Sequence, residues 1–308
     1  MRKGLLFAVG LLAAVVAHAQ FSVPVAKPVR PLPAIEHVVV IGIDGLRPDR
    51  LLLADSPVIH GMIKEGTYTF WARTTAVSVT LPSFTSMMTA VNPRKHQIEW
   101  DRDLPFATPV YPRFPTIFEM ATKAGYVTAM TAGKSKFGAL NKPGTIAHCF
   151  IAAKEVVPDQ DVVDEAVKII AEHKPNFLFV HLPGVDTAGH AKGWGSHEQL
   201  AQIAITDAQV GRVLAALDQA GLRGSTVVIL SADHGGQGLT HGPEDARSRH
   251  IPWIAIGPGV KKFHDLTQQA DLNVQTEDTC ATACWLLGLP QQPYFDGKPV
   301  YAAFENAP

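Results

Sequence analysis

The feature that most constrains the fold is the stretch VILSADHGGQGLTHG, which covers residues 228–242. It continues a short β-branched run, Val227–Leu230, that is typical of a strand buried in a parallel sheet. Behind this strand come Asp233, His234 and, seven residues later, His241. Carboxylates and imidazoles bind divalent metals, so a glycine-rich loop that carries them at the end of a strand predicts a metal site. A simple Asp-His-Gly turn is the alternative interpretation.

The rest of the chain alternates apolar runs with amphipathic segments. Further strands are predicted over residues 37–43, 126–131, 177–181 and 251–256. Helices are predicted over residues 49–66, 84–90, 112–125, 160–173, 196–220 and 278–287. This alternation favours an α/β fold of three layers, in which a mainly parallel central sheet has helices on both faces. We expect one domain, residues 35–308, preceded by a proline-rich tether over residues 20–34.

The N-terminal residues 1–19 have a different character. Two basic residues at positions 2 and 3 precede an apolar stretch over residues 5–16, and Ala17-His18-Ala19 forms an A-x-A cleavage site. This pattern predicts a secretory signal peptide and therefore a periplasmic or secreted protein. An uncleaved anchor is disfavoured because a membrane span needs about 20 apolar residues. No later stretch reaches that length, so we expect no membrane span after cleavage.

Charge and cysteine content narrow the range of partners. Lys and Arg number 27 and Asp and Glu number 28, so no basic excess indicates specific nucleic-acid binding. We expect a small-molecule partner, and the sequence leaves the oligomeric state open. Three cysteines leave at least one thiol unpaired. Cys280 and Cys284 lie one helical turn apart and are predicted to be buried, while the fate of Cys149 stays open.

Other predicted loops carry the same kind of side chain. Asp44 follows the strand over residues 37–43, and Asp186 and His190 lie in a predicted loop after the strand over residues 177–181. Thr80 lies at or just before a predicted helix start, since Pro82 suits a first turn. Loops of this kind gather at one edge of an open α/β sheet. Two Asp-plus-His pairs, one more Asp and one more His would then form two three-ligand sites, the arrangement of a two-metal hydrolase.

The order of these motifs resembles a known family. They are Ile43-Asp44-Gly45, Thr80-Leu81-Pro82-Ser83, Asp186-x-x-Gly189-His190, Asp233-His234-Gly235 and His241-Gly242. In this order they resemble the alkaline phosphatase superfamily, and within it the nucleotide pyrophosphatase/type I phosphodiesterase branch. The resemblance covers essentially everything after the tether and implies an alkaline phosphatase-like fold.

The resemblance also implies a cofactor and a site. It implies two Zn²⁺ ions, the first held by Asp44, Asp233 and His234. The second would be held by Asp186, His190 and His241. Thr80 would lie between them as the nucleophile, with its oxygen on the first zinc. The implied activity is hydrolysis of phosphodiesters or nucleotide pyrophosphate bonds through a phosphothreonine intermediate.

Physical chemistry supports this role for Thr80 independently. A threonine hydroxyl is a poor nucleophile at neutral pH, and a nearby metal ion lowers its pKa. The start of a helix adds partial positive charge where a phosphate would bind. Two successive displacements at phosphorus predict overall retention of configuration.

Two positions depart from the family pattern and bear on substrate binding. Asp101 stands where the family has an asparagine that binds a phosphate oxygen, and a carboxylate there repels phosphate unless it is protonated or paired, with Arg102 as the candidate partner. His181 replaces the family's tyrosine before the Asp-x-x-Gly-His motif. We expect Asp101, Arg102 and His181 to contact substrate. The segments over residues 99–113 and 134–143 are expected to set specificity, and the physiological substrate is left open.

Alternatives remain at each level. Thr80 is also explained as a helix cap, the strand-end aspartates as turn residues, and His190 and His241 as surface histidines. His250 competes with His241 but borders a strand and lacks the following glycine. At the level of function, the rivals are a phosphomonoesterase on the same metals and a non-catalytic metal-binding relic. Sulfatase activity is discounted because Thr80-Leu81-Pro82-Ser83 lacks the C/S-x-P-x-R motif.

Overall fold

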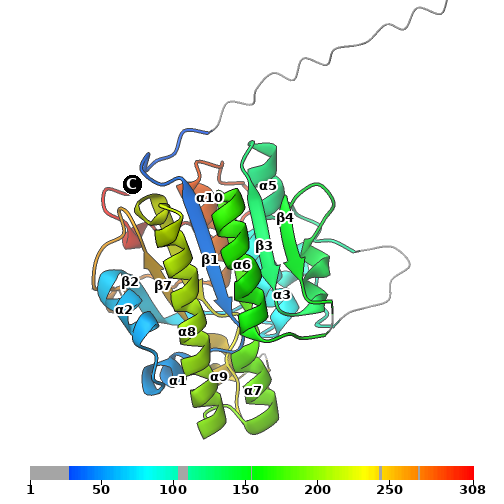
Figure 1. Cartoon of the computed structure of the whole chain (residues 1–308). Coiled ribbons are helices and arrows are strands. Elements are labelled where there is room, and N and C mark those ends of the chain that lie inside the picture. The colour runs from blue at the N-terminus through cyan, green and yellow to red at the C-terminus, as the bar shows by residue number, and fades with distance from the viewer. Residues whose placement is uncertain (1–27, 103–109, 154, 243–244, 270) are drawn as a thin grey trace, which may run out of the picture.

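The structure is a computed structural model that describes residues 28–102, 110–153, 155–242, 245–269 and 271–308 (Figure 1). The predicted signal peptide and the first part of the predicted tether lie outside the described residues. The last tether residues lie against the domain, where Leu32 packs on the hydrophobic core. Ile35 is fully buried and begins the core.

Within the described residues, eight strands form one sheet in the order β4-β3-β5-β1-β6-β7-β2-β8. The strands are β1 (His37–Ile43), β2 (Thr67–Arg73), β3 (Thr128–Ala132), β4 (His148–Ile151), β5 (Phe177–Leu182), β6 (Thr226–Ser231), β7 (His250–Ile256) and β8 (His264–Asp265). Strands β4, β3, β5, β1 and β6 are mutually parallel, whereas β7 runs antiparallel to both β6 and β2. The prediction of a mainly parallel central sheet is therefore confirmed.

Helices cover both faces of this sheet (Figure 1). They are α1 (Pro48–Leu53), α2 (Pro57–Glu65), α3 (Thr80–Thr89), α4 (Pro93–His96), α5 (Ile117–Lys123), α6 (Asp159–His173), α7 (Gly184–Lys192), α8 (His197–Gln219), α9 (Ala246–Arg249) and α10 (Thr276–Leu286). Helix α8 packs against α2, α6 and α7, whereas α3 packs against α5 and α10 on the other side. The three layers predicted from the sequence are present.

The layers explain the sequence patterns of strands and helices. Every residue of β1, β5 and β6 is buried, because helices lie on both sides of these central strands. Helix α8 has the length and hydropathy of a membrane span, but its residues Ile203, Val210 and Val213 are buried within the domain. Cys280 and Cys284 are buried as predicted, with free thiols.

Several predicted elements have different bounds. The helix expected over residues 49–66 is two helices, because the residue before Pro57 is disfavoured in helical backbone. Gly66 has an extended backbone and no left-handed cap. The helix expected over residues 112–125 is only α5, which begins after Thr116, whose side chain accepts a hydrogen bond from the Glu119 amide. Asp186 and His190 lie in helix α7 and not in a loop.

The sheet topology brings distant parts of the chain to one edge. Ile43 of β1 pairs with Leu182 of β5, and Gly42 pairs with Ser231 of β6. On the other side of β5, Ala132 of β3 pairs with His181. Because these four strands are parallel, the segments that follow them all begin at the same edge of the sheet.

Candidate active site

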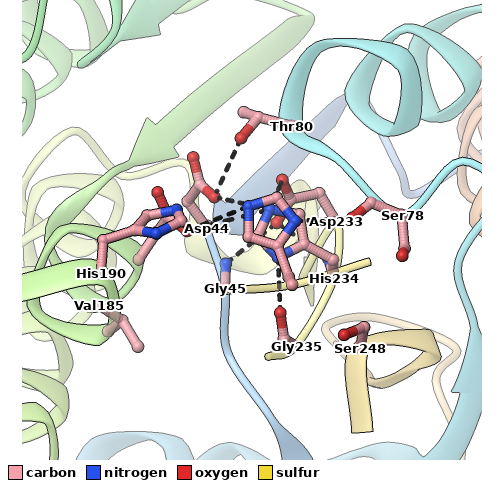
Figure 2. A network of polar contacts seen from close by, with 12 residues as sticks. Asp44, Gly45, Ser78, Thr80, Val185, His190, Asp233, His234, Gly235 and Ser248 are labelled. Carbon is pink, nitrogen blue, oxygen red and sulfur yellow. Dashed lines mark hydrogen bonds and ion pairs between the residues drawn. The ribbon is translucent and has the colours of Figure 1, made fainter. Parts of the chain in front are cut away.

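The predicted metal ligands lie together at this carboxyl edge (Figure 2). They are Asp44, Asp186, His190, Asp233, His234 and His241. Asp44 follows β1, and Asp233 and His234 follow β6. Asp186 and His190 lie four residues apart in α7 and therefore share one helix face. The structure thus brings together side chains that are up to 197 positions apart in the sequence.

The first predicted ligand set is tightly grouped and fully buried. The Nε2 atom of His234 lies 3.4 Å from Oδ1 of Asp44 and 3.2 Å from Oδ2 of Asp233. The same Nε2 lies 4.0 Å from Oδ1 of Asp186, which belongs to the second predicted set. The two predicted sets are therefore neighbours.

The second predicted set lies toward the surface. Oδ1 of Asp186 is 3.4 Å from Nε2 of His190 and 4.0 Å from Nε2 of His241. The imidazole of His241 stacks on that of His234, with ring centroids 3.7 Å apart. His250, the alternative to His241, packs edge-on against the ring of Trp71 at the start of β7. The structure therefore groups His241, and not His250, with Asp186.

The three clustered histidines are oriented by backbone carbonyl groups. Nδ1 of His190 lies 3.0 Å from the carbonyl oxygen of Leu239, and Nδ1 of His234 lies 2.7 Å from that of Gly235. Nδ1 of His241 lies 2.8 Å from the carbonyl oxygen of Ser78. A carbonyl oxygen only accepts, so each Nδ1 carries the proton and each Nε2 presents a lone pair. This is the way in which metal-binding histidines are held.

Several buried acceptors in this cluster lack a donor. Among the described residues, Asp186 Oδ1, Asp233 Oδ2 and His234 Nε2 are buried without any hydrogen-bond partner. Leaving such atoms unpaired is costly, and acceptors that face one another are satisfied by a cation. The imidazole nitrogens and carboxylate oxygens present here are the ligands that zinc takes. The donor set therefore fits zinc.

Electrostatics agree with this interpretation. Burial, together with the nearby His241, lowers the pKa of His234 to about 4, so its imidazole is neutral. Burial opposes ionisation of Asp44, but the Lys134 ammonium and a hydrogen bond from His181 outweigh burial and hold its pKa well below the usual value. Burial and the neighbouring carboxylates of Asp44 and Asp186 raise the pKa of Asp233. Full ionisation of the cluster therefore needs additional positive charge.

Thr80 lies beside this cluster at the first position of α3 (Figure 2). Its hydroxyl oxygen is 3.4 Å from Oδ1 of Asp44. It lines a cavity of about 830 Å³, whose other lining residues include Arg102, Lys136 and His190. The predicted nucleophile, the predicted ligand cluster and an open cavity therefore meet at one place.

Trp194 explains why glycine stands at position 189, in one motif, and at position 236, directly after another. Its ring would lie within 2.7 Å of a Cβ placed on Gly189 and within 2.3 Å of one placed on Gly236. Its indole nitrogen donates to the carbonyl oxygen of Gly45 at 2.9 Å. The glycines therefore let Trp194 pack beneath the ligand loops and join them.

His181 does not have the role expected from the sequence. It is fully buried, and rings of Phe84 and Phe137 pack against it, so it offers no surface to a substrate. The Gly133 amide donates to its Nδ1 at 3.2 Å, which leaves Nε2 to donate to Oδ2 of Asp44 at 3.0 Å. The expectation of a substrate contact is corrected: His181 orients Asp44.

Lys134 is a site residue that the sequence analysis placed only in a specificity segment. Its Nζ lies 2.7 Å from Oδ2 of Asp44 and 2.6 Å from Oδ2 of Asp186. Burial alone would lower the pKa of Lys134, but these two carboxylates raise it, so the ammonium stays charged. One signal was available: Lys134 follows a predicted strand, as the predicted ligands do.

Asp101 lines the cavity, but its partner is not the expected one. Its Oδ1 accepts hydrogen bonds at 2.8 Å from Nζ of Lys136 and at 2.8 Å from the backbone amide of Leu81. The pairing expected with Arg102 is corrected to Lys136, although Arg102 also lines the cavity. The carboxylate of Asp101 therefore accepts the hydrogen bond of a backbone amide at the start of α3. A phosphate oxygen was expected to bind at this place.

We predict that Asp101→Asn strengthens binding of inorganic phosphate at least about tenfold, because it removes a negative charge from the start of α3, where a phosphate is expected to bind. Titration calorimetry of the zinc-loaded protein with phosphate measures this change. The matched control is Asp164→Asn, since Asp164 is half-exposed and pairs with Arg212 on the surface. Unchanged or weaker phosphate binding in Asp101→Asn would contradict the prediction.

Comparisons with known proteins agree with the fold. A family model described as type I phosphodiesterase/nucleotide pyrophosphatase matches residues 38–247. The alkaline phosphatase PhoD of Zymomonas mobilis is 38% identical over 104 residues, which cover 31% of this chain and 17% of that protein. The match thus spans less than a fifth of that relative.

Solved structures share the architecture at low sequence identity. Murine ectonucleotide pyrophosphatase/phosphodiesterase 5, as an inactive variant in complex with AMP, has a TM-score of 0.72 at 14% identity, covering 88% of this chain and 100% of that one. A 2-O GAG sulfatase has a TM-score of 0.71 at 16% identity, covering 91% of this chain and 74% of that one. The alkaline phosphatase-like fold expected from the motifs is confirmed.

Proposed function

The chain belongs to the type I phosphodiesterase/nucleotide pyrophosphatase family, and we propose that it is an exported two-zinc hydrolase of phosphodiesters or nucleotide pyrophosphate bonds. One observation carries the proposal. The Nε2 atoms of His190, His234 and His241 point into a cluster of buried carboxylates beside the hydroxyl of Thr80. The sequence of residues 1–19 supports export to the periplasm or the medium.

The ligands are assigned as the sequence motifs suggest. Asp44, Asp233 and His234 would hold one zinc ion. Asp186, His190 and His241 would hold the other. Bound there, zinc ions supply Lewis acidity that lowers the pKa of a hydroxyl and neutralises phosphoryl charge.

The residues then perform two displacements. The hydroxyl of Thr80 gives up its proton to water, its oxygen forms a bond to phosphorus, and the ester bond to the alcohol or nucleotide fragment breaks. The departing oxygen takes a proton from water. A second water then attacks the phosphothreonine, the bond from phosphorus to Thr80 breaks, and the hydroxyl is restored. Two inversions leave the configuration at phosphorus unchanged.

A phosphomonoesterase on the same residues is the second candidate function. The ammonium groups of Lys134 and Lys136 line the cavity and suit a doubly charged phosphoryl group. Hydrolysis of bis-(p-nitrophenyl) phosphate and of p-nitrophenyl phosphate, measured on protein of known zinc content, distinguishes the two functions. Faster cleavage of the diester supports our proposal, and the reverse order supports the monoesterase. A zinc-free protein that gains no activity when zinc is supplied would be a relic.

A further inference from the structure

Lys134 occupies a position that no predicted role explains. Its side chain is 11% exposed and ends between the two ligand sets, on Oδ2 of Asp44 and Oδ2 of Asp186. The same Nζ lies 3.5 Å from the hydroxyl oxygen of Thr80. One ammonium thus touches one carboxylate of each predicted zinc set and faces the predicted nucleophile.

Backbone contacts with the segment around Val156 and with β5 fix the position of Lys134. Lys134 forms an antiparallel bridge with Val156, and the Val157 amide donates to the carbonyl oxygen of Gly133 at 3.0 Å. The amide of Gly133 is fixed by Nδ1 of His181. Because β3 lies next to β5, the segment after β3 enters the site beside Asp186. The position of the ammonium is therefore set by the sheet.

The oxygens that Lys134 contacts are not the ones that face the three clustered histidines, although Oδ2 of Asp44 also accepts from the buried His181. In Asp44, Oδ2 binds Lys134, whereas Oδ1 faces His234 and Thr80. In Asp186, Oδ2 binds Lys134, whereas Oδ1 faces the three clustered histidines. The ammonium is therefore compatible with cations on the other oxygens, and it does not need to leave when they bind.

We propose that Lys134 is a catalytic residue of this site, and the inference rests on the proposed function. Its ammonium bridges the two ligand sets and donates a hydrogen bond to the oxygen of Thr80 and to the phosphoryl group that Thr80 carries. It acts there as a hydrogen-bond donor and a positive charge. Such a group stabilises the charge that develops on the transferred phosphoryl oxygens.

The test compares Lys134→Met with the wild-type protein in its zinc-loaded and zinc-free forms. We expect kcat to fall about a hundredfold while KM changes less, because the lost contact is made mainly in the transition state. We also expect zinc to bind about tenfold more tightly, since removing a neighbouring positive charge favours a cation. The zinc-free variant should unfold at a lower temperature, because two buried carboxylates lose their partner.

Opposite changes in activity and in zinc affinity distinguish this role from a structural one. A side chain needed only for folding would lower both together, and that result, or a kcat within threefold of wild type, would overturn the proposal. Lys134→Gln keeps hydrogen-bond donors for the carboxylates and repeats the test without depending on the folding of the methionine variant. Lys142→Met is the matched control, because Lys142 is a half-exposed lysine paired with Glu119.

The wild-type protein separates this inference from the proposed function. An inactive wild type that binds no zinc would overturn both together. An active wild type whose Lys134 variants keep their turnover would overturn only the role of Lys134.

Discussion

Replacing Thr80 with alanine should reduce phosphoester hydrolysis at least about a thousandfold, because no other atom takes over the phosphoryl group. Zinc content should stay at the wild-type value, since the hydrogen bonds of the Thr80 hydroxyl to the described residues are long, 3.4 Å to Asp44 and 3.5 Å to Lys134. The fold should also persist, because the hydroxyl provides no cap for α3. Steady-state kinetics and metal analysis on the same preparation measure these quantities.

Two control variants make this result specific. Thr80→Ser keeps the hydroxyl and should keep most of the turnover. Thr89→Ala removes a buried hydroxyl that bonds only the Thr85 carbonyl one turn earlier in α3, so it should change stability slightly and leave turnover intact. More than a tenth of wild-type turnover in Thr80→Ala would mean that a different group attacks phosphorus.

Replacing Asp233 with asparagine should remove zinc and activity together, whereas its effects on stability should have opposite signs in the two metal states. The Oδ1 atom of Asp233 accepts hydrogen bonds of 3.0 Å from the amides of Gly45 and His234, and asparagine keeps an acceptor there. Within the part of the chain that the structure describes, the Oδ2 atom is buried and unpartnered beside Nε2 of His234, so its charge is available to a cation. We expect turnover to fall at least about a hundredfold.

The expected change in unfolding temperature follows from repulsion between the carboxylate of Asp233 and its neighbouring carboxylates. In the zinc-free protein, Asp233 lies among Asp44 and Asp186, and burial and both carboxylates raise its pKa. Removing its charge should therefore raise the unfolding temperature in the presence of a chelator, and lower it when zinc is supplied. Asp164→Asn serves again as the control. Equal shifts with and without zinc would mean that Asp233 is structural and not a ligand.

Much of this architecture follows from local sequence patterns. The apolar runs of β1, β5 and β6 are long and continuous enough to be recognised as buried strands, and they are fully buried. Parallel strands place the residues that follow them at one edge, so Asp44, Asp186 and Asp233 could be expected to meet. Ser196 and Thr116 cap the helices that follow them, as their residue types favour.

Where the local sequence pattern was ambiguous, the helices in the structure have different bounds from the predicted ones. The apolar residues over 49–66 keep a helical spacing although the segment forms two helices. Hydrophobic periodicity does not reveal that the residue before Pro57 is disfavoured in helical backbone. Asp186 and His190 are predicted to lie in a loop after a strand, but they lie in helix α7, where a Cβ on Gly189 would meet the ring of Trp194.

By itself, the sequence determined the fold class and the set of side chains at the sheet edge, because burial and strand direction are encoded in residue type and spacing. The tertiary structure alone decided how those side chains are paired. It assigned His181 to Asp44, Asp101 to Lys136, and Lys134 to the carboxylates of both ligand sets. These partners come from strands and loops far apart in the chain, so their contacts depend on which strands are neighbours in the sheet, and no local pattern contains that information.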